Sequence, residues 1–339
     1  MSNLAKIFLS IAAIFILLGG VLFLVMAISV DFNFKKLGAK NYENNTHEIS
    51  EEFSNILIET STANINFLPS EDEKCKVVCY ELKKVKHSIN VEDNTLKVNA
   101  IDKRRWYDYI SINFNHPELT IYLPESEYLS LVIKEDTGDI KLDNFRFENI
   151  AISLSTGDIE LNNISCKELI SKGSTGDITL KDVIVEEKIS ITRSTGDVKF
   201  SRIDAQEIHI KSSTGNFSLK NVNSNLLKIA ISTGKTILDA ISCKELISTG
   251  STGDITLKDV IVEEKISITR NTGDVKFSRI DAQEIYIKTS TGDVVGSILT
   301  DKVYIVRTDT GKIDVPKTIT GGRCEINTST GDIKITVVN

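Results

Sequence analysis

Apolar residues alternate with polar ones through most of the second half of the chain. Between residues 176 and 195, the apolar residues Ile178, Leu180, Ile189 and Ile191 are each flanked by polar side chains. This two-residue period predicts half-buried β-strands, because successive side chains of a strand point to opposite faces. Most of the inward positions are β-branched, which favours a pleated backbone.

A short turn sequence, Thr-Gly-Asp or a close variant, interrupts this alternation at nearly constant intervals. Eleven copies occur, and they begin at Thr137, Thr156, Thr175, Thr195, Thr214, Thr233, Thr252, Thr272, Thr291, Thr310 and Thr330. So constant a period predicts one structural unit that stacks on copies of itself.

The glycine of each copy is expected to reverse the chain sharply, because only glycine adopts a positive φ without steric cost. A softer corner is expected near Val183 and its equivalents. The expected turn glycines are Gly138, Gly157, Gly176, Gly196, Gly215, Gly234, Gly253, Gly273, Gly292, Gly311 and Gly331. The predicted fold class is therefore all-β: a parallel β-helix, or solenoid, with about 19–20 residues per coil, at least eleven coils and a right-handed path.

Repeated S-T-G-D-I/V units behind one N-terminal apolar segment resemble the putative-adhesin family of bacterial envelope proteins, a domain of unknown function. The resemblance covers residues 52–339 and includes the strand at residues 58–67 and the segment at residues 120–124. It implies a parallel β-solenoid on the cell surface, and it implies no specific ligand.

One part of the array is duplicated. Residues 164–215 and 241–292 differ at only four positions, and the second block begins four whole repeats after the first. A solenoid tolerates an in-phase insertion of this kind, because each coil contacts only its neighbours. Copying coils multiplies length and surface, whereas it does not create a catalytic constellation.

The N-terminus carries an uncharged apolar segment from Ile7 to Val30. A helix of this length is about 36 Å long and would cross a hydrocarbon core of about 30 Å. We expect an uncleaved, single-pass membrane anchor with the repeats outside the cell; a cleaved signal peptide is the alternative. The flanking lysines do not fix the orientation.

The remaining boundaries follow from composition. Residues 1–30 are expected to form a cytoplasmic tip and anchor, 31–51 a polar juxtamembrane linker, 52–130 a strand-rich N-terminal cap, and 131–339 the repeat solenoid. Thr62, followed by Ala63-Asn64 in place of Gly-Asp, is expected to begin a first, divergent coil. Hairpins that cap an open sheet end protect it from pairing with other chains.

Charge and cysteine content exclude several classes of protein. The formal net charge is −7, so a basic face for nucleic acid is not expected. The five cysteines do not form a disulfide framework, since no pair has suitable spacing. Cys75 and Cys79 also lack a second cysteine pair or a nearby histidine motif, so no metal site is expected there. No cofactor is expected.

Two groups of side chains are candidate sites. The aspartates of the turns would stack into a ladder, and the weak calcium candidates are Asp139, Asp158, Asp177, Asp197, Asp254, Asp274 and Asp293. The alternative is that each aspartate accepts a hydrogen bond from nearby backbone. The only aromatic–basic cluster, Arg104, Arg105, Trp106, Tyr107 and Tyr109, is either a binding patch or a loop whose rings cover the first coil.

Catalysis is not expected. The four histidines share no motif, and the chain lacks a nucleophile elbow, a phosphate-binding glycine loop and a zinc pattern. The expected function is adhesion, display or scaffolding through an unknown protein or polysaccharide partner. Two alternatives stay open: an envelope-stress regulator that acts through protein contacts, and a polysaccharide-active β-helix enzyme.

Overall fold

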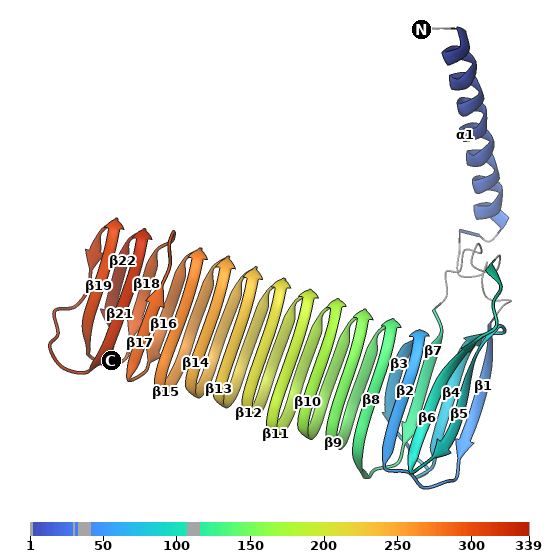
Figure 1. Cartoon of the computed structure of the whole chain (residues 1–339), viewed down its shortest axis with the longest axis horizontal. Coiled ribbons are helices and arrows are strands. Elements are labelled where there is room, and N and C mark those ends of the chain that lie inside the picture. Colours follow the sequence, from blue (N-terminus) through green and yellow to red (C-terminus); the bar gives the residue numbers. More distant parts are fainter. Residues whose placement is uncertain (1–2, 30, 33–41, 107–115, 339) are drawn as a thin grey trace.

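The computed structural model describes residues 3–29, 31–32, 42–106 and 116–338. It contains one helix, α1 (Asn3–Ser29), joined through the cap end to a long rod of strands. Figure 1 shows the rod extending from the cap, near the helix, to the C-terminal strands. The segment Lys6–Ser29 of α1 has a mean hydropathy of 3.0 and lies almost wholly outside the packed core, so it is long and apolar enough to span a membrane.

The rod is a parallel β-solenoid of about 11 turns, as the sequence predicts. Its regular strands pair in parallel with the strand one coil before and one coil after. They are β8 (Glu127–Thr137), β9 (Ile140–Thr156), β10 (Ile159–Thr175), β11 (Ile178–Thr195), β12 (Val198–Thr214), β13 (Phe217–Thr233), β14 (Thr236–Thr252) and β15 (Ile255–Thr272).

The strands are longer than expected because they bend without ending. In β9 to β15, and in β16 (Val275–Asp281), the expected soft corner lies within the strand at a residue with positive φ, and the hydrogen-bonded register continues beyond it. These corner residues are Asn144, Asn163, Asp182, Arg202, Asn221, Ala240, Asp259 and Arg279. Asparagine and aspartate tolerate this left-handed conformation better than most residues, which explains why they hold most of these corners.

A continuous apolar column fills the solenoid. Ile178, Leu180, Ile189 and Ile191 are all at most 1% exposed, and the equivalent residues of neighbouring coils stack on them. Burial of a side chain of this size stabilises the fold by about 1.5–3 kcal/mol, although the column is complete only when coils stack. The alternating pattern therefore marks the inward face correctly.

The first coil begins at Thr62, as expected. Strand β2 (Asn55–Thr62) pairs in parallel with β8, and Thr62 faces Thr137. Strand β3 (Asn64–Pro69) continues the coil beneath β9. Asn64 takes the place of an aspartate, since its Oδ1 accepts the N–H of Asp139 at 3.0 Å.

The cap lies beyond this coil and mixes both strand directions. Strand β6 (Thr95–Asp102) pairs in parallel with β2, and β7 (Glu118–Leu123) with β3. Antiparallel strands then cover these two: β5 (Val85–Glu92) lies on β6, and β4 (Cys75–Leu82) lies on β7. The predicted strand at residues 110–114 lies outside the described residues.

The N-terminal boundary of the cap differs from the expectation. Residues 42–49, predicted as part of a polar linker, form strand β1 (Tyr42–Ile49), which pairs antiparallel with β4. This strand has few apolar residues because it is the outermost strand of its sheet, with only Tyr42 buried. Tyr42 also stacks on Tyr80, with ring centroids 4.8 Å apart.

The C-terminal coils do not stack in sequence order. Strands β16 (Val275–Asp281), β17 (Glu284–Lys288) and β18 (Val294–Ile298) continue the array, but β21 (Gly322–Thr330) lies between β17 and β19 (Lys302–Thr310). Likewise β22 (Ile333–Val337) lies between β18 and β20 (Ile313–Asp314). The last coil in the sequence is therefore the second-to-last in space, and β19 forms the outer end of the rod (Figure 1).

Candidate functional site

The Thr-Gly-Asp turns stack into one continuous ridge along the rod. At Gly176 the φ angle is 128°, and a Cβ atom placed there would lie 1.9 Å from the carbonyl oxygen of Gly157. The Gly176 N–H donates to the carbonyl of Thr195 in the next coil at 3.0 Å. Glycine is thus required both for the backbone angle and for the close approach of adjacent coils.

The aspartates of this ridge bind the backbone of the following turn. The Asp177 N–H donates to Oδ1 of Asp158 at 2.8 Å, and the Asp197 N–H donates to Oδ1 of Asp177 at 2.8 Å. Asn216 continues the series, because its amide oxygen accepts the N–H of Lys235 at 3.1 Å. Lys235 interrupts it, since an ammonium group cannot accept a hydrogen bond.

This ladder gives the aspartates a role that requires no ion. One oxygen of each carboxylate accepts a backbone N–H, and an asparagine oxygen serves equally well at residues 64 and 216. The alternative that each aspartate caps a turn therefore has a direct geometric basis. Calcium binding by the seven weak candidates stays a prediction.

The aromatic–basic cluster is only partly described. Trp106 is 77% exposed, so its ring does not cover a coil of the solenoid. Arg104 forms an ion pair with Asp102, with Nη2 and Oδ2 2.6 Å apart. Tyr107 and Tyr109 lie outside the described residues. The binding patch at this cluster stays a prediction.

Two arginines are buried inside the solenoid, which the alternating pattern does not predict. The Arg193 guanidinium lies where Gly173 of the preceding coil lacks a side chain, and its Nη2 donates to Ser171 at 3.1 Å. Arg270 repeats this arrangement beside Gly250 and Ser248 four coils later. Burial lowers the pKa of both arginines to about 10. A glycine one coil before an inward arginine is the sequence signal for this packing.

The remaining expectations about titratable residues agree with the structure. All five cysteines are free and buried. His209 and Tyr286, the differing pair of the duplication, lie half-exposed between buried isoleucines. The carboxylate pair at residues 186–187 is exposed at a bulge in the β11–β12 register. This bulge accommodates the extra residue of the longer repeats.

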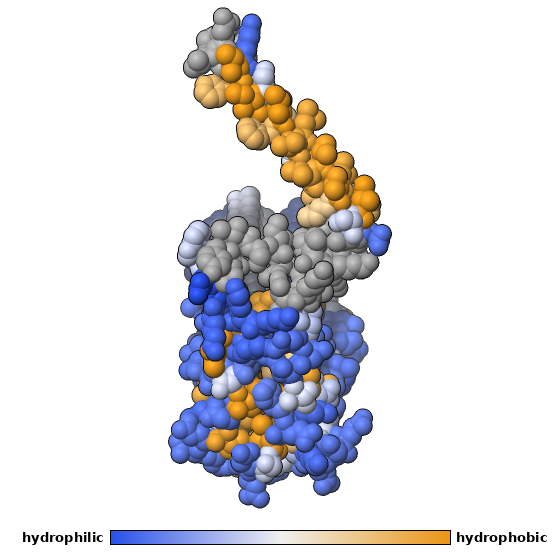
Figure 2. All heavy atoms as spheres, turned by 90° about the vertical axis from the view of Figure 1, so that its right-hand side faces the viewer, coloured by the Kyte–Doolittle hydropathy of each residue, from blue (hydrophilic) through white to orange (hydrophobic). Residues whose placement is uncertain are grey.

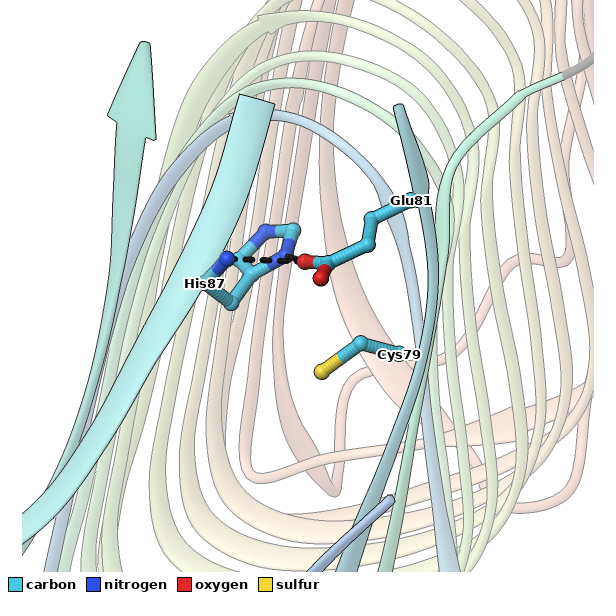
Figure 3. Close-up of side chains that lie close together, drawn as sticks. All are labelled: Cys79, Glu81 and His87. Carbon is cyan, nitrogen blue, oxygen red and sulfur yellow. Dashed lines mark hydrogen bonds and ion pairs between the residues drawn. The ribbon is translucent and has the colours of Figure 1, made fainter. Parts of the chain in front are cut away.

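One buried cluster was missed at the level of sequence. Cys79 and Glu81 point inward from β4, and His87 points toward them from β5 (Figure 3). One ligand-type atom of each side chain lies within 4.8 Å of the others. Oε2 of Glu81 lies 2.7 Å from Nδ1 of His87 and also accepts the His87 backbone N–H at 2.7 Å. The short turn at residues 83–84 carries the chain from β4 to β5 on the opposite side of the cap and brings the three side chains together, whereas their spacing matches no familiar motif.

Comparison with known proteins places this chain in a family. The parallel coils and the strand-rich cap with antiparallel pairs define the chain as a capped β-solenoid protein. The Toastrack DUF4097 family model matches residues 53–234 and 221–339. The chain therefore belongs to the Toastrack DUF4097 family, and no curated protein matches it significantly.

The solved structures that the chain matches include those of three bacterial proteins. A putative adhesin from Bacteroides fragilis is 15% identical, with 87% of this chain and 97% of that chain covered and a TM-score of 0.32. A putative cell adhesion protein from Clostridium sporogenes is 13% identical, with 88% and 100% covered and a TM-score of 0.25. A putative adhesin from Parabacteroides merdae is 11% identical, with 89% and 98% covered and a TM-score of 0.28.

Proposed function

We propose that this protein is a non-catalytic, membrane-anchored rod that displays a repeated binding surface outside the cell, as an adhesin or a scaffold. The observation that carries the proposal is the in-phase duplication. The two copies lie four whole coils apart, so they preserve the register of the core, and they also repeat the outward chemistry of the faces.

The repeated outward chemistry is visible in pairs of equivalent residues. Ion pairs join Arg202 to Asp182 and, at the equivalent positions of the second block, Arg279 to Asp259. Ile184 is exposed, and so is Ile261 at the equivalent position. A partner that binds one copy weakly would bind two copies on the same rod more tightly, because the second contact is intramolecular.

The anchor and the aromatic–basic cluster fit the same proposal. α1 would hold the cap end of the rod at the membrane, and the coils would extend the partner-binding faces away from it. Arg104, Arg105 and exposed Trp106 would add a contact at the cap, since tryptophan and arginine are frequent at the centres of binding interfaces. The partner is a protein or a polysaccharide of the envelope or of another surface.

Removal of one copy tests this proposal. Deleting residues 164–240 joins Asn163 to Ile241, which is the equivalent of the Ile164 that normally follows Asn163. The deletion shortens the rod by four coils, about 19 Å. We expect the variant to fold and to be displayed, and we expect intact cells that carry it to bind surfaces at least about tenfold more weakly.

The matched control deletes residues 164–230, which breaks the phase of the coils and should prevent folding beyond the junction. Protease treatment of intact cells reports whether the repeats are outside. Repeats that are protected in intact cells and digested only after lysis would contradict surface display. Equal surface binding by the full chain and the in-phase variant would contradict a function of the repeated surface.

A further inference from the structure

The buried cluster in the cap has the composition of a metal site. Cys79, Glu81 and His87 supply a sulfur, a carboxylate oxygen and an imidazole nitrogen, and the three side chains are at most 7% exposed. Figure 3 shows all three directed into the same interior space between β4 and β5. Thiolate, imidazole and carboxylate are the protein ligands that zinc prefers.

We propose that Cys79, Glu81 and His87 bind one divalent cation of the zinc type, with a water molecule as the fourth ligand. Nothing in the family relationship assigns this site, and it is separate from the repeated faces of the solenoid. It is independent of the proposed adhesive function.

The groups around the cluster are arranged as outer partners of metal ligands. Nδ2 of Asn45 donates to Oε1 of Glu81 at 2.6 Å, and Nζ of Lys86 lies 3.5 Å from the same oxygen. These contacts fix the carboxylate so that Oε2 faces His87. Nε2 of His87 lies 3.4 Å from Oγ1 of Thr60, which orients the ring with Nδ1 toward the carboxylate. Such outer contacts commonly position metal ligands.

The distances require only a small adjustment. Two ligand atoms about 2.1 Å from a tetrahedral zinc ion are about 3.4 Å apart, whereas Oε2 of Glu81 and Nδ1 of His87 are 2.7 Å apart. The hydrogen-bonded pair would open by about 0.7 Å to admit the ion. The sulfur of Cys79 already lies within 4.8 Å of both partners.

A cavity lies beside His87, although neither Cys79 nor Glu81 lines it. A cavity of about 250 Å³ is lined by His87 and Thr60 and continues past Ala100 to Asp102 and His116. It is large enough for several water molecules. An ion would enter from this side by passing the His87 ring, and a water molecule from the cavity would supply the fourth ligand.

Binding would exchange a proton for the ion. Zinc binds the thiolate form of cysteine, and an unperturbed thiol has a pKa of about 8.5, so the Cys79 thiol would lose its proton on coordination. Coordination forms the sulfur–metal bond and releases the thiol proton to solvent. The apparent affinity should therefore increase with pH, as it does for other thiolate-bound metals.

The site would reinforce the contact between two consecutive strands that do not pair with each other and that Glu81 already links through His87 and Lys86. β4 pairs with β1 and β7, whereas β5 pairs with β6 on the other side of the cap. A bound ion would connect these two sides at the end of the rod next to the membrane segment. The ion would stabilise the cap, where the apolar column of the solenoid ends and a coil has a neighbour on one side only.

Cobalt titration of the full chain tests the site. The detergent-solubilised protein, stripped with a chelator, should bind one equivalent of Co²⁺ with a sulfur-to-cobalt charge-transfer absorption, and Zn²⁺ should displace it. Cys79→Ser and His87→Gln should each weaken binding on the order of 100-fold or more. Cys75→Ser, a buried thiol on the same strand but outside the cluster, should bind like the unmodified chain.

Several results would overturn the proposal. They are absence of stoichiometric uptake, cobalt spectra without the sulfur band, or variants at Cys79 and His87 that bind normally. If Cys79→Ser does not fold, the unmodified chain still decides the matter through its spectrum and through proton release on Zn²⁺ addition. An uptake without proton release would show that the thiol is no ligand, and the trio would then be a buried hydrogen-bonded network.

Discussion

Each turn glycine is constrained by its own φ angle and by the carbonyl of the coil beneath it. Gly196 has a φ of 143°, and a Cβ atom there would lie 2.0 Å from the oxygen of Gly176. The same positive φ and the same close approach to the carbonyl of the neighbouring turn recur along the ridge. A side chain at any of these turn glycines would therefore collide with the backbone of the neighbouring coil and would disturb both its own coil and the adjacent one.

Gly196→Ala should therefore destabilise the rod by about 3 kcal/mol or more, since strain and overpacking add. Circular dichroism during thermal unfolding would measure the loss. Ser194→Asn is the matched control, because the duplicate carries Asn271 at that position, and it should change stability by less than about 0.5 kcal/mol. An alanine variant as stable as the control would contradict the close stacking of the turns.

Glu135 is a second residue with a large individual effect. It is 3% exposed, its Oε1 accepts the N–H groups of Ala63 and Thr137, and its Oε2 has no hydrogen-bond partner among the described residues. Burial and, to a lesser degree, Asp136 raise the pKa of Glu135 from 4.5 to about 7. In the folded protein, Glu135 is therefore mainly protonated below about pH 7.

The sign of the resulting pH dependence follows from this shift. Between pH 4.5 and about 7 the unfolded chain releases the proton of Glu135 while the folded chain keeps it, so stability decreases as pH rises. A shift of this size corresponds to about 3 kcal/mol. The unmodified chain should lose about 3 kcal/mol of stability through Glu135 between pH 4.5 and pH 8, and Glu135→Gln should not show this loss. Denaturant unfolding of both proteins at each pH would measure the difference. Parallel pH profiles of the two proteins would refute this.

At the residue scale, the sequence predicted those positions whose structural role recurs in every coil. The turn glycines and inward isoleucines recur in every coil, so their positions followed from the period alone. Arg193, Glu135 and His87 occur at inward positions that polar residues rarely occupy, and their burial depends on particular neighbours. Arg193 packs beside Gly173, and His87 packs beside Glu81. Neither contact can be predicted without knowing which strands are neighbours.

At the scale of elements, the corners and the end of the rod differ in how firmly the sequence determines them. A corner is local: a residue such as Asp182 adopts positive φ, and the chain turns. The end of the rod depends on the order of the last coils. The turns at Thr310 and Thr330 both keep the Thr-Gly sequence and the repeat spacing, so periodicity alone favours stacking in sequence order, whereas the structure exchanges these two coils.

Two adjacent glycines explain the exchange of the last coils. A Cβ atom at Gly321 would lie 1.8 Å from the oxygen of Asp301, and one at Gly322 would lie 2.1 Å from the oxygen of Gln283. Only a backbone without side chains can pass between these two carbonyls. The pair lets β21 enter between β17 and β19.

Gly322→Ala should displace β21 and leave the rest of the rod intact, because each coil contacts only its neighbours. Amide hydrogen exchange of the full chain should become fast in residues 299–339 and stay unchanged before residue 280. Ile319→Ala, at a 92% exposed position of the connecting segment, serves as the control and should leave exchange unchanged. Uniformly slow exchange in the Gly322 variant would argue against the inserted strand.

At the scale of the whole molecule, the architecture follows almost entirely from the period. Coil length, strand direction, the inward face and the first coil at Thr62 were all predictable, since stacking makes every coil repeat the same contacts. The cap was predictable only as strand-rich. Its antiparallel pairings join residues far apart in sequence, such as Tyr42 and Leu82, and no period relates them. Figure 2 shows the cap end of the rod, where polar side chains cover much of the surface beneath the apolar helix.

The duplication also has a consequence for inheritance. The two nearly identical blocks, residues 164–215 and 241–292, lie four whole repeats apart, so recombination between the DNA segments that encode them would remove or add four repeats at once. Asn163 and Ala240, the residues before the two blocks, have φ angles of 51° and 55°, so each recombinant would join coils of matching conformation. Rod length could therefore vary between descendant cells by whole steps of four coils, without an intermediate generation in which the protein fails to fold.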